Sequence, residues 1–155
     1  MTDTKVILTE QSDDDEEFRK MFLPLIEYLK EVGCEKKKHS KGTRNLLHHL
    51  VSVSAILSER GASDDLCKAG LFHSIYGTSF YKNKTVSLDE RDKIKKLIGE
   101  WAETLVYEFC MIPKDRRSAI MKLENGPLRN DLADLAYANS DEQRLWKEKN
   151  NDNVT

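Results

Sequence analysis

The sequence has little of the residue types that mark several protein classes. Its 155 residues include only three cysteines, three prolines and seven glycines. The cysteines are odd in number and too far apart for a C-x-x-C clip, which is typical of reduced, mostly buried thiols in the cytoplasm. No apolar run approaches the roughly 18 residues that a membrane span needs, and the N-terminus lacks the pattern of a signal peptide. We therefore expect a cytoplasmic protein with no membrane partner.

An excess of charge of one sign is also missing. The 25 basic and 27 acidic residues leave a formal net charge of −2. A globally basic surface for nucleic acid is therefore not expected, and we predict no specific nucleic-acid partner. The length fits one domain that buries a core without disulfides. We expect a disordered or frayed tail over residues 1–15, one helical domain over residues 16–149 and a polar tail over residues 150–155.

Helical periodicity is the main local signal in the chain. Apolar residues recur every three or four positions, and strand-like alternation of useful length is absent. The sequence therefore predicts an all-α fold, a single compact helical bundle. Pro24 is expected to kink the first helix or to delay its start. The predicted helices cover about residues 18–32, 44–60, 64–73, 88–112, 116–123 and 128–138, and the third, apolar almost all round, should be the buried centre.

The four histidines all lie in the first half of the chain. At about 100° per residue, the apolar stripe of the helix over 44–60 lies near His49, whereas His48 points to solvent. His73 lies on the helix that should be buried. Two buried imidazoles need partners for their ring nitrogens. Two interpretations fit: core histidines bonded to backbone carbonyls or water, or a metal site.

The segments around this pair carry a recognisable pattern. Residues 49–57 read His-Leu-Val-Ser-Val-Ser-Ala-Ile-Leu, Gly61 follows, residues 69–74 read Ala-Gly-Leu-Phe-His-Ser, and the two histidines are 24 residues apart. This resembles the HD-domain metal phosphohydrolases, especially the hydrolase domain of RelA/SpoT-type alarmone enzymes. Residues 98–106 and 132–139 are similar to two further helices of that family. The resemblance covers about residues 39–139 and implies an HD-like helical bundle.

The resemblance also implies a metal site. Carried over to this sequence, its ligands are His49, His73 and Asp134, with His39 as a candidate fourth ligand. The implied cofactor is a divalent ion (Mn, Fe, Zn or Mg), with a metal-free site as the alternative. Helix geometry leaves open that Asp134 is a solvated carboxylate, because it lies about 100° or more from the apolar stripe of its helix. Asp131, closer to that stripe, is then a substitute.

Two departures from the family pattern bear on function. The family's metal-binding Asp after the second histidine is Ser74 here, which matches an uncharacterised subfamily with His-Ser in place of His-Asp. The acidic pair that acts on water in alarmone hydrolases falls on Gly77 and Thr78. Alarmone hydrolysis is therefore not expected. Ser74, Tyr76 and Thr78 are the candidates for lining a pocket.

Three functions stay open at this stage. The leading hypothesis is a metal-dependent hydrolase of a phosphorylated small molecule or nucleotide. The second is a catalytically inactive HD-like module that binds a small ligand or a protein, and the third is an HD-type iron-dependent oxygenase. Lysines on two polar loops would flank a phosphorylated ligand: Lys36, Lys37, Lys38, Lys41, Lys82 and Lys84.

Overall fold

The computed structural model describes residues 13–38, 44–80, 82 and 84–151. Within these residues the fold is all-α and forms a single domain, as predicted, with one isolated β-bridge between Lys38 and Asn45 and no strand. None of the described helices combines the length and apolar character needed to cross a membrane. The elements are α2 (Asp13–Glu31), α3 (Leu46–Glu59), α4 (Asp64–Phe72), the short 3-10 helix η1 (Leu88–Glu90), α5 (Arg91–Ile98), α6 (Glu100–Met111), α7 (Arg116–Met121) and α8 (Pro127–Asn151).

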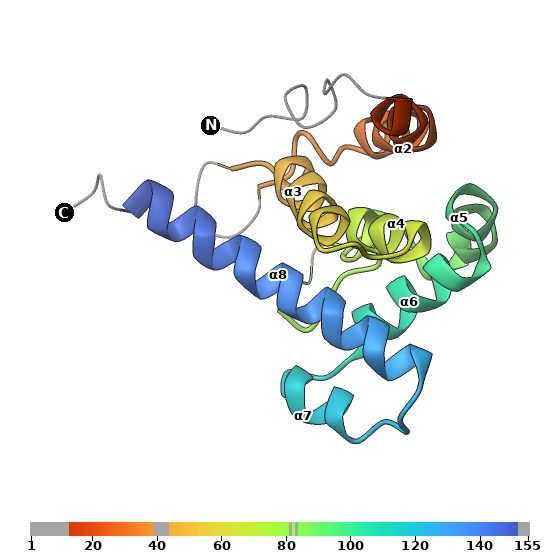
Figure 1. The fold of residues 1–155 in the computed structure, drawn as a ribbon. Coiled ribbons are helices and arrows are strands. Elements are labelled where there is room, and N and C mark those ends of the chain that lie inside the picture. Colours follow the sequence, from red (N-terminus) through yellow and green to blue (C-terminus); the bar gives the residue numbers. More distant parts are fainter. Residues whose placement is uncertain (1–12, 39–43, 81, 83, 152–155) are drawn as a thin grey trace.

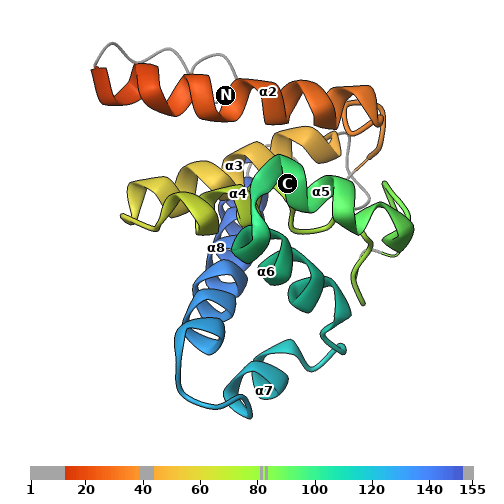
Figure 2. The ribbon, with the colours of Figure 1, turned by 90° about the vertical axis from the view of Figure 1, so that its right-hand side faces the viewer.

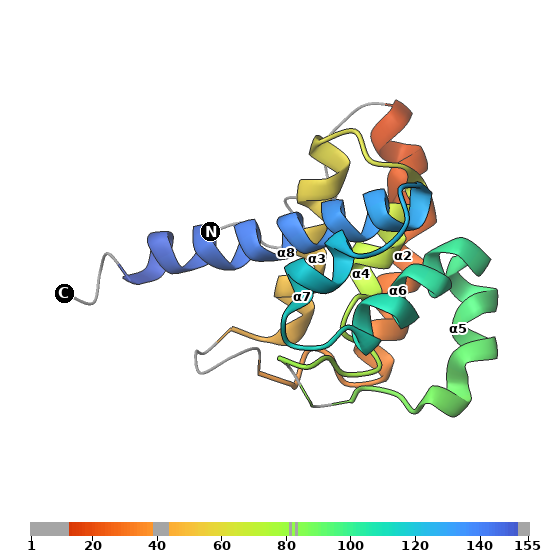
Figure 3. The ribbon, with the colours of Figure 1, turned by 90° about the horizontal axis from the view of Figure 1, so that it is seen from below.

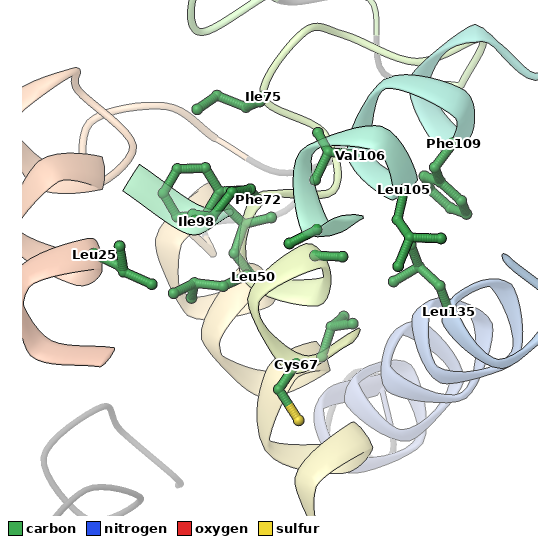
Figure 4. Packing of buried hydrophobic residues seen from close by; sticks show 14 of the residues in the cluster. Leu25, Leu50, Cys67, Phe72, Ile75, Ile98, Leu105, Val106, Phe109 and Leu135 are labelled. Carbon is green, nitrogen blue, oxygen red and sulfur yellow. The ribbon is translucent and has the colours of Figure 1, made fainter. Parts of the chain in front are cut away.

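Helix α4 lies at the centre of the domain, as its apolar composition predicts. It contacts α3, α5, α6 and α8. Helix α2 lies lengthwise across the top of the molecule in Figure 2 and is seen nearly end-on at the upper right of Figure 1. Helix α8 runs across α3 and α4 on another side, as Figure 3 shows. Figure 4 shows Leu25 of α2, Leu50 of α3, Phe72 of α4 and Leu135 of α8, all buried, in the common core.

The single helix predicted over 88–112 is broken at Gly99. Its φ of 96° lies in the left-handed region that favours glycine, and its backbone N–H bonds to the carbonyl of Lys95 at 2.8 Å. The chain turns there and continues as α6. Ile98 before the break and Ala102 after it are both buried, so the turn lets two short helices use the same core.

Two helix boundaries also differ from the predictions. Helix α2 begins at Asp13 and continues through Pro24, so the proline does not delay its start. Helix α8 was expected to end near residue 138 and runs to Asn151 instead. Residues 13–15 and 150–151 therefore belong to helices, and the rest of the two predicted tails lies outside the described residues. The extension of α8 carries Asn139 and Glu142, which contact His49.

The contact between α3 and α4 depends on Gly70. A Cβ atom at this position would lie 2.7 Å from Cδ1 of Leu57 and 3.5 Å from Cα of Ser54. We expect Gly70→Val to lower the free energy of unfolding by about 2 kcal/mol, because the core must shift to hold the added atoms. Urea denaturation measures this. Gly126→Val is the control, since a Cβ at Gly126 meets nothing within 4 Å; equal losses in the two variants would contradict the prediction.

Candidate metal centre

The packing of α3 on α4 brings the two predicted histidines together. The Nε2 atoms of His49 and His73 lie 3.3 Å apart, and their rings meet edge to face with centroids 5.1 Å apart. Both side chains are almost completely buried. The sequence prediction that both imidazoles face the interior is therefore confirmed, and the two rings approach each other through their Nε2 atoms.

The other ring nitrogens fix the tautomers. Nδ1 of His73 lies 2.7 Å from the carbonyl oxygen of Gly70, which can only accept a hydrogen bond. Nδ1 of His49 lies 2.6 Å from Oε1 of Glu142, whose other oxygen accepts from Arg44 at 2.5 Å. Both Nδ1 atoms therefore donate. A neutral imidazole carries one N–H, so each Nε2 presents a lone pair to the other.

Burial keeps both rings neutral. It lowers the pKa of His49 to about 3, and the positive charge of Arg44 acts in the same direction. It also lowers the pKa of His73 to about 3, with the neighbouring imidazole of His49 as a further cause. A shared proton between the two Nε2 atoms is therefore disfavoured near pH 7. Two nitrogen lone pairs 3.3 Å apart repel each other unless an electropositive group lies between them.

Helix α8 completes the site with residues that the sequence analysis did not assign. Oδ1 of Asn139 lies 2.9 Å from Nε2 of His49, and Glu142 joins His49 to Arg44. The guanidinium of Arg44 lies over the ring of Trp146, 4.4 Å from its centroid. Asn139, Glu142 and Arg44 are all buried. For Asn139 and Glu142 the sequence held a signal, because both continue the helical spacing of the inward-facing residues of α8. These residues are Leu128, Leu132, Leu135, Asn139, Glu142 and Trp146.

The residues fit a divalent metal ion. Two nitrogens bound tetrahedrally to one zinc ion at about 2.0–2.1 Å lie about 3.3–3.4 Å apart, which matches the Nε2 pair. In metal centres the second ring nitrogen of a histidine ligand typically donates to a carboxylate, as Nδ1 of His49 does to Glu142. Within the described residues no group of three or more His, Cys, Asp and Glu is placed to hold a metal, so a third protein ligand would have to be the amide oxygen of Asn139.

The structure does not bring Asp134 to the histidine pair, which corrects its assignment as a ligand. The reason is helix phase: Asp134 precedes Asn139 by five residues, about 140° around α8. The substitute Asp131 accepts from the indole N–H of Trp101 at 2.9 Å instead. Asp134 is exposed and lines a surface pocket of about 430 Å³ whose other residues are Leu57, Arg60, Gly61, Ala62, Tyr137 and Asp141.

The two remaining histidines have different outcomes. His39, the candidate fourth ligand, lies outside the described residues. His48 was expected to point to solvent, but it is half-buried, because α8 extends far enough to place Trp146 against it with ring centroids 5.3 Å apart. The two adjacent histidines thus face different surroundings on one helix, and only His49 belongs to the pair.

A protein-family model covers part of this site. The model of a domain of unknown function, DUF6817, matches residues 28–114. The chain belongs to this family. The comparisons with curated proteins and with solved structures gave no match. The DUF6817 segment contains both His49 and His73, whereas Asn139 and Glu142 follow it on α8.

The three pocket candidates within the DUF6817 segment are all buried. Tyr76 is 1% exposed and its hydroxyl donates to Glu103 at 2.8 Å, so it belongs to the core and not to a pocket opening. Thr78 accepts a hydrogen bond from the backbone N–H of Phe80 at 3.2 Å. Ser74 differs from both, because its buried hydroxyl has no hydrogen-bond partner among the described residues.

A hydrogen bond joins the two polar loops that carry lysines. Nζ of Lys37 donates to the carbonyl of Lys84 at 2.8 Å.

All three cysteines are buried and none forms a disulfide. Burial raises the pKa of Cys67 to about 11, so its thiol stays protonated at neutral pH.

Proposed function

We propose that this chain is an HD-like protein that holds a divalent metal ion between His49 and His73. One observation carries the proposal: with each Nδ1 donating to an acceptor, the two Nε2 lone pairs face each other at 3.3 Å. A cation between them turns this repulsion into coordination. Rotation of the Asn139 amide would give His49 an N–H donor, but it would leave Nε2 of His73 facing a lone pair.

The protein's own residues divide into two roles. His49, His73 and the amide oxygen of Asn139 would contact the ion. Glu142 and the carbonyl of Gly70 hold the imidazoles in the required tautomer. Two imidazoles favour zinc, iron or another transition metal over magnesium, which prefers oxygen ligands. All three candidate ligands are neutral, so we expect weaker binding than at a site with a carboxylate ligand.

The reaction that we propose is hydrolysis of a phosphorylated small molecule. When bound, a divalent ion lowers the pKa of a coordinated water toward neutrality and makes it a nucleophile. The chain's contribution is to keep the ligands neutral, oriented and largely shielded from solvent, as the burial of both histidines supports. The water would form a bond to phosphorus while the bond from phosphorus to the ester oxygen breaks, and the leaving alcohol would take up the proton that the water releases.

A second candidate, a catalytically inactive module that binds a ligand, is favoured by the state of Glu142. Its Oε1 accepts from His49 and its Oε2 accepts from Arg44. Both oxygens are therefore engaged. A carboxylate with both oxygens held in this way is poorly placed to act as a general base. This candidate predicts ligand binding without turnover.

Metal binding is tested by calorimetric titration of Zn²⁺, Mn²⁺ and Fe²⁺ and by elemental analysis of the purified protein. We expect His73→Ala and His49→Ala to abolish binding, whereas His48→Ala, on the next residue of the same helix, leaves it unchanged. Asn139→Asp should raise the affinity, because it places a carboxylate among neutral ligands. The control for the added charge is Asn130→Asp, at an exposed position of α8. Equal binding in wild type and His73→Ala would overturn the proposal.

Three assays then separate the functions. Turnover on a nucleotide and phosphoester panel that requires metal and is lost in His73→Ala supports the hydrolase. A rise in melting temperature with a ligand of the same panel, without turnover, supports the inactive module. Iron in the purified protein with an oxygen-dependent colour change supports the iron oxygenase.

A further inference from the structure

An arginine stands near the histidine pair without a counter-ion. Arg116, the first residue of α7, contacts two aromatic rings, with its guanidinium carbon 4.2 Å from the centroid of Phe109 and 4.8 Å from that of Phe80. The ring of Phe109 in turn meets the ring of His73 edge to face at 5.5 Å. Figure 4 shows Phe109 at the end of α6, above α8. One aromatic ring therefore separates the guanidinium from the proposed metal centre.

The charge of Arg116 is not balanced within the protein. Across the described residues no carboxylate lies within ion-pair distance of it, and its buried Nε has no acceptor. Two other arginines do have a buried carboxylate partner: Arg44 is paired with Glu142 and Arg91 with Glu103. Burial lowers the pKa of Arg116, which indicates that its charge is poorly solvated. A partly buried cation without a partner costs free energy that a bound anion would recover.

A divalent ion placed at the histidine pair would be repelled by the charge of Arg116. An anion bound at Arg116 would balance that charge and weaken the repulsion.

We propose that Arg116 binds a phosphate group of a ligand. An aromatic ring offers no oxygen acceptor, so contact with Phe80 and Phe109 leaves the N–H donors of the guanidinium to bond oxygen atoms. Those donors form a planar fork suited to an oxyanion such as phosphate. Phe80 is 62% exposed, so this end of the arrangement reaches the surface. The phosphate contact does not depend on the proposed function.

The segment that carries Phe80 is held in place by two hydrogen bonds. Oγ of Ser79 donates to the carbonyl of Ile112 at 2.6 Å, next to the start of α7. Oγ1 of Thr78 accepts from the N–H of Phe80 at 3.2 Å. Thr78, singled out from the sequence as a pocket residue, therefore contributes by positioning the ring beside Arg116.

Calorimetric titration with inorganic phosphate tests the inference, in the presence and in the absence of Zn²⁺. We expect Arg116→Ala to weaken phosphate binding at least 10-fold, because a charge-assisted hydrogen bond is lost. Arg116→Lys should also weaken it, since lysine keeps the charge but lacks the fork. The matched control is Arg117→Ala, which removes the same charge from the exposed neighbour on α7 and should leave binding unchanged.

The outcomes separate this inference from the proposed metal site. Phosphate binding that is lost in Arg116→Ala but unchanged in His73→Ala, in protein that takes up no metal, supports the phosphate contact while the metal proposal fails. Equal phosphate binding by wild type and Arg116→Ala overturns the contact, as does wild-type protein that binds no phosphate. Acetate that binds as tightly as phosphate overturns the choice of phosphate. Circular dichroism checks that Arg116→Ala folds, and Arg116→Lys supplies the readout if it does not.

Discussion

Replacing Arg91 by methionine is expected to lower the free energy of unfolding by about 3–5 kcal/mol at pH 7. The carboxylate of Glu103 is completely buried and accepts three hydrogen bonds: from Nε of Arg91 at 2.7 Å, from Nη2 of Arg91 at 2.8 Å and from Tyr76 at 2.8 Å. Removing Arg91 leaves a buried charge with one neutral donor. Urea denaturation measures the loss, and Arg144→Met, which removes an exposed pair with Glu148, should cost less than about 1 kcal/mol.

The effect of Arg91→Met depends on pH in a defined direction. Burial alone would raise the pKa of Glu103, but the hydrogen bonds from Arg91 and Tyr76 outweigh it and hold the pKa below its ordinary value. This contribution to stability is present above about pH 4.3, the ordinary pKa of glutamate, and is lost as the pH falls through the folded-state pKa. Without Arg91 the carboxyl group takes up a proton more readily. The difference between wild type and variant should therefore shrink below about pH 5; a constant difference would contradict this account.

Replacing Arg44 by methionine is expected to cost about 3 kcal/mol or more in the free energy of unfolding. Its side chain and that of Glu142 are 3% and 6% exposed, so the variant leaves a buried carboxylate beside a neutral imidazole. The double variant Arg44→Met/Glu142→Gln should recover much of the loss, because no charge stays buried and the amide oxygen can still accept from Nδ1 of His49.

The control for Arg44→Met is an exposed ion pair whose carboxylate also lies on α8. Arg60 bonds to Asp141 of α8 at 2.7 Å, with side chains 48% and 30% exposed. We expect Arg60→Met to cost no more than about 1 kcal/mol. A double variant as unstable as Arg44→Met alone would show that the cost arises elsewhere, for example from the lost contact with Trp146.

The helices and the histidine pair could be predicted because their signals are local. Apolar spacing within α3 sets which way His49 points, and the apolar composition of α4 places His73 in the interior. Their distance in sequence matched a family pattern. No property beyond a short window of sequence was needed for either prediction.

The α8 side of the site could not be predicted in the same way. The sequence alone does not distinguish a buried Asn139 or Glu142 from an exposed one. When only apolar residues are counted, the apolar stripe of α8 therefore ends at Ala138. The burial of these side chains depends on Arg44 and His49, which lie 98 and 93 residues away from Glu142. For Asp134 the resemblance pointed to a metal ligand, and the phase of the full helix decided against it.

These sequence separations also impose an order of events during synthesis. The residues that orient His49 and complete the candidate ligand set lie on the last helix described, so the site cannot assemble until nearly the whole domain has left the ribosome. Closing a loop of that size has an entropic cost that must be met before its contacts form. The site of a partly synthesised chain therefore lacks Asn139 and Glu142, and under the proposed function full metal affinity would arise only once α8 has docked.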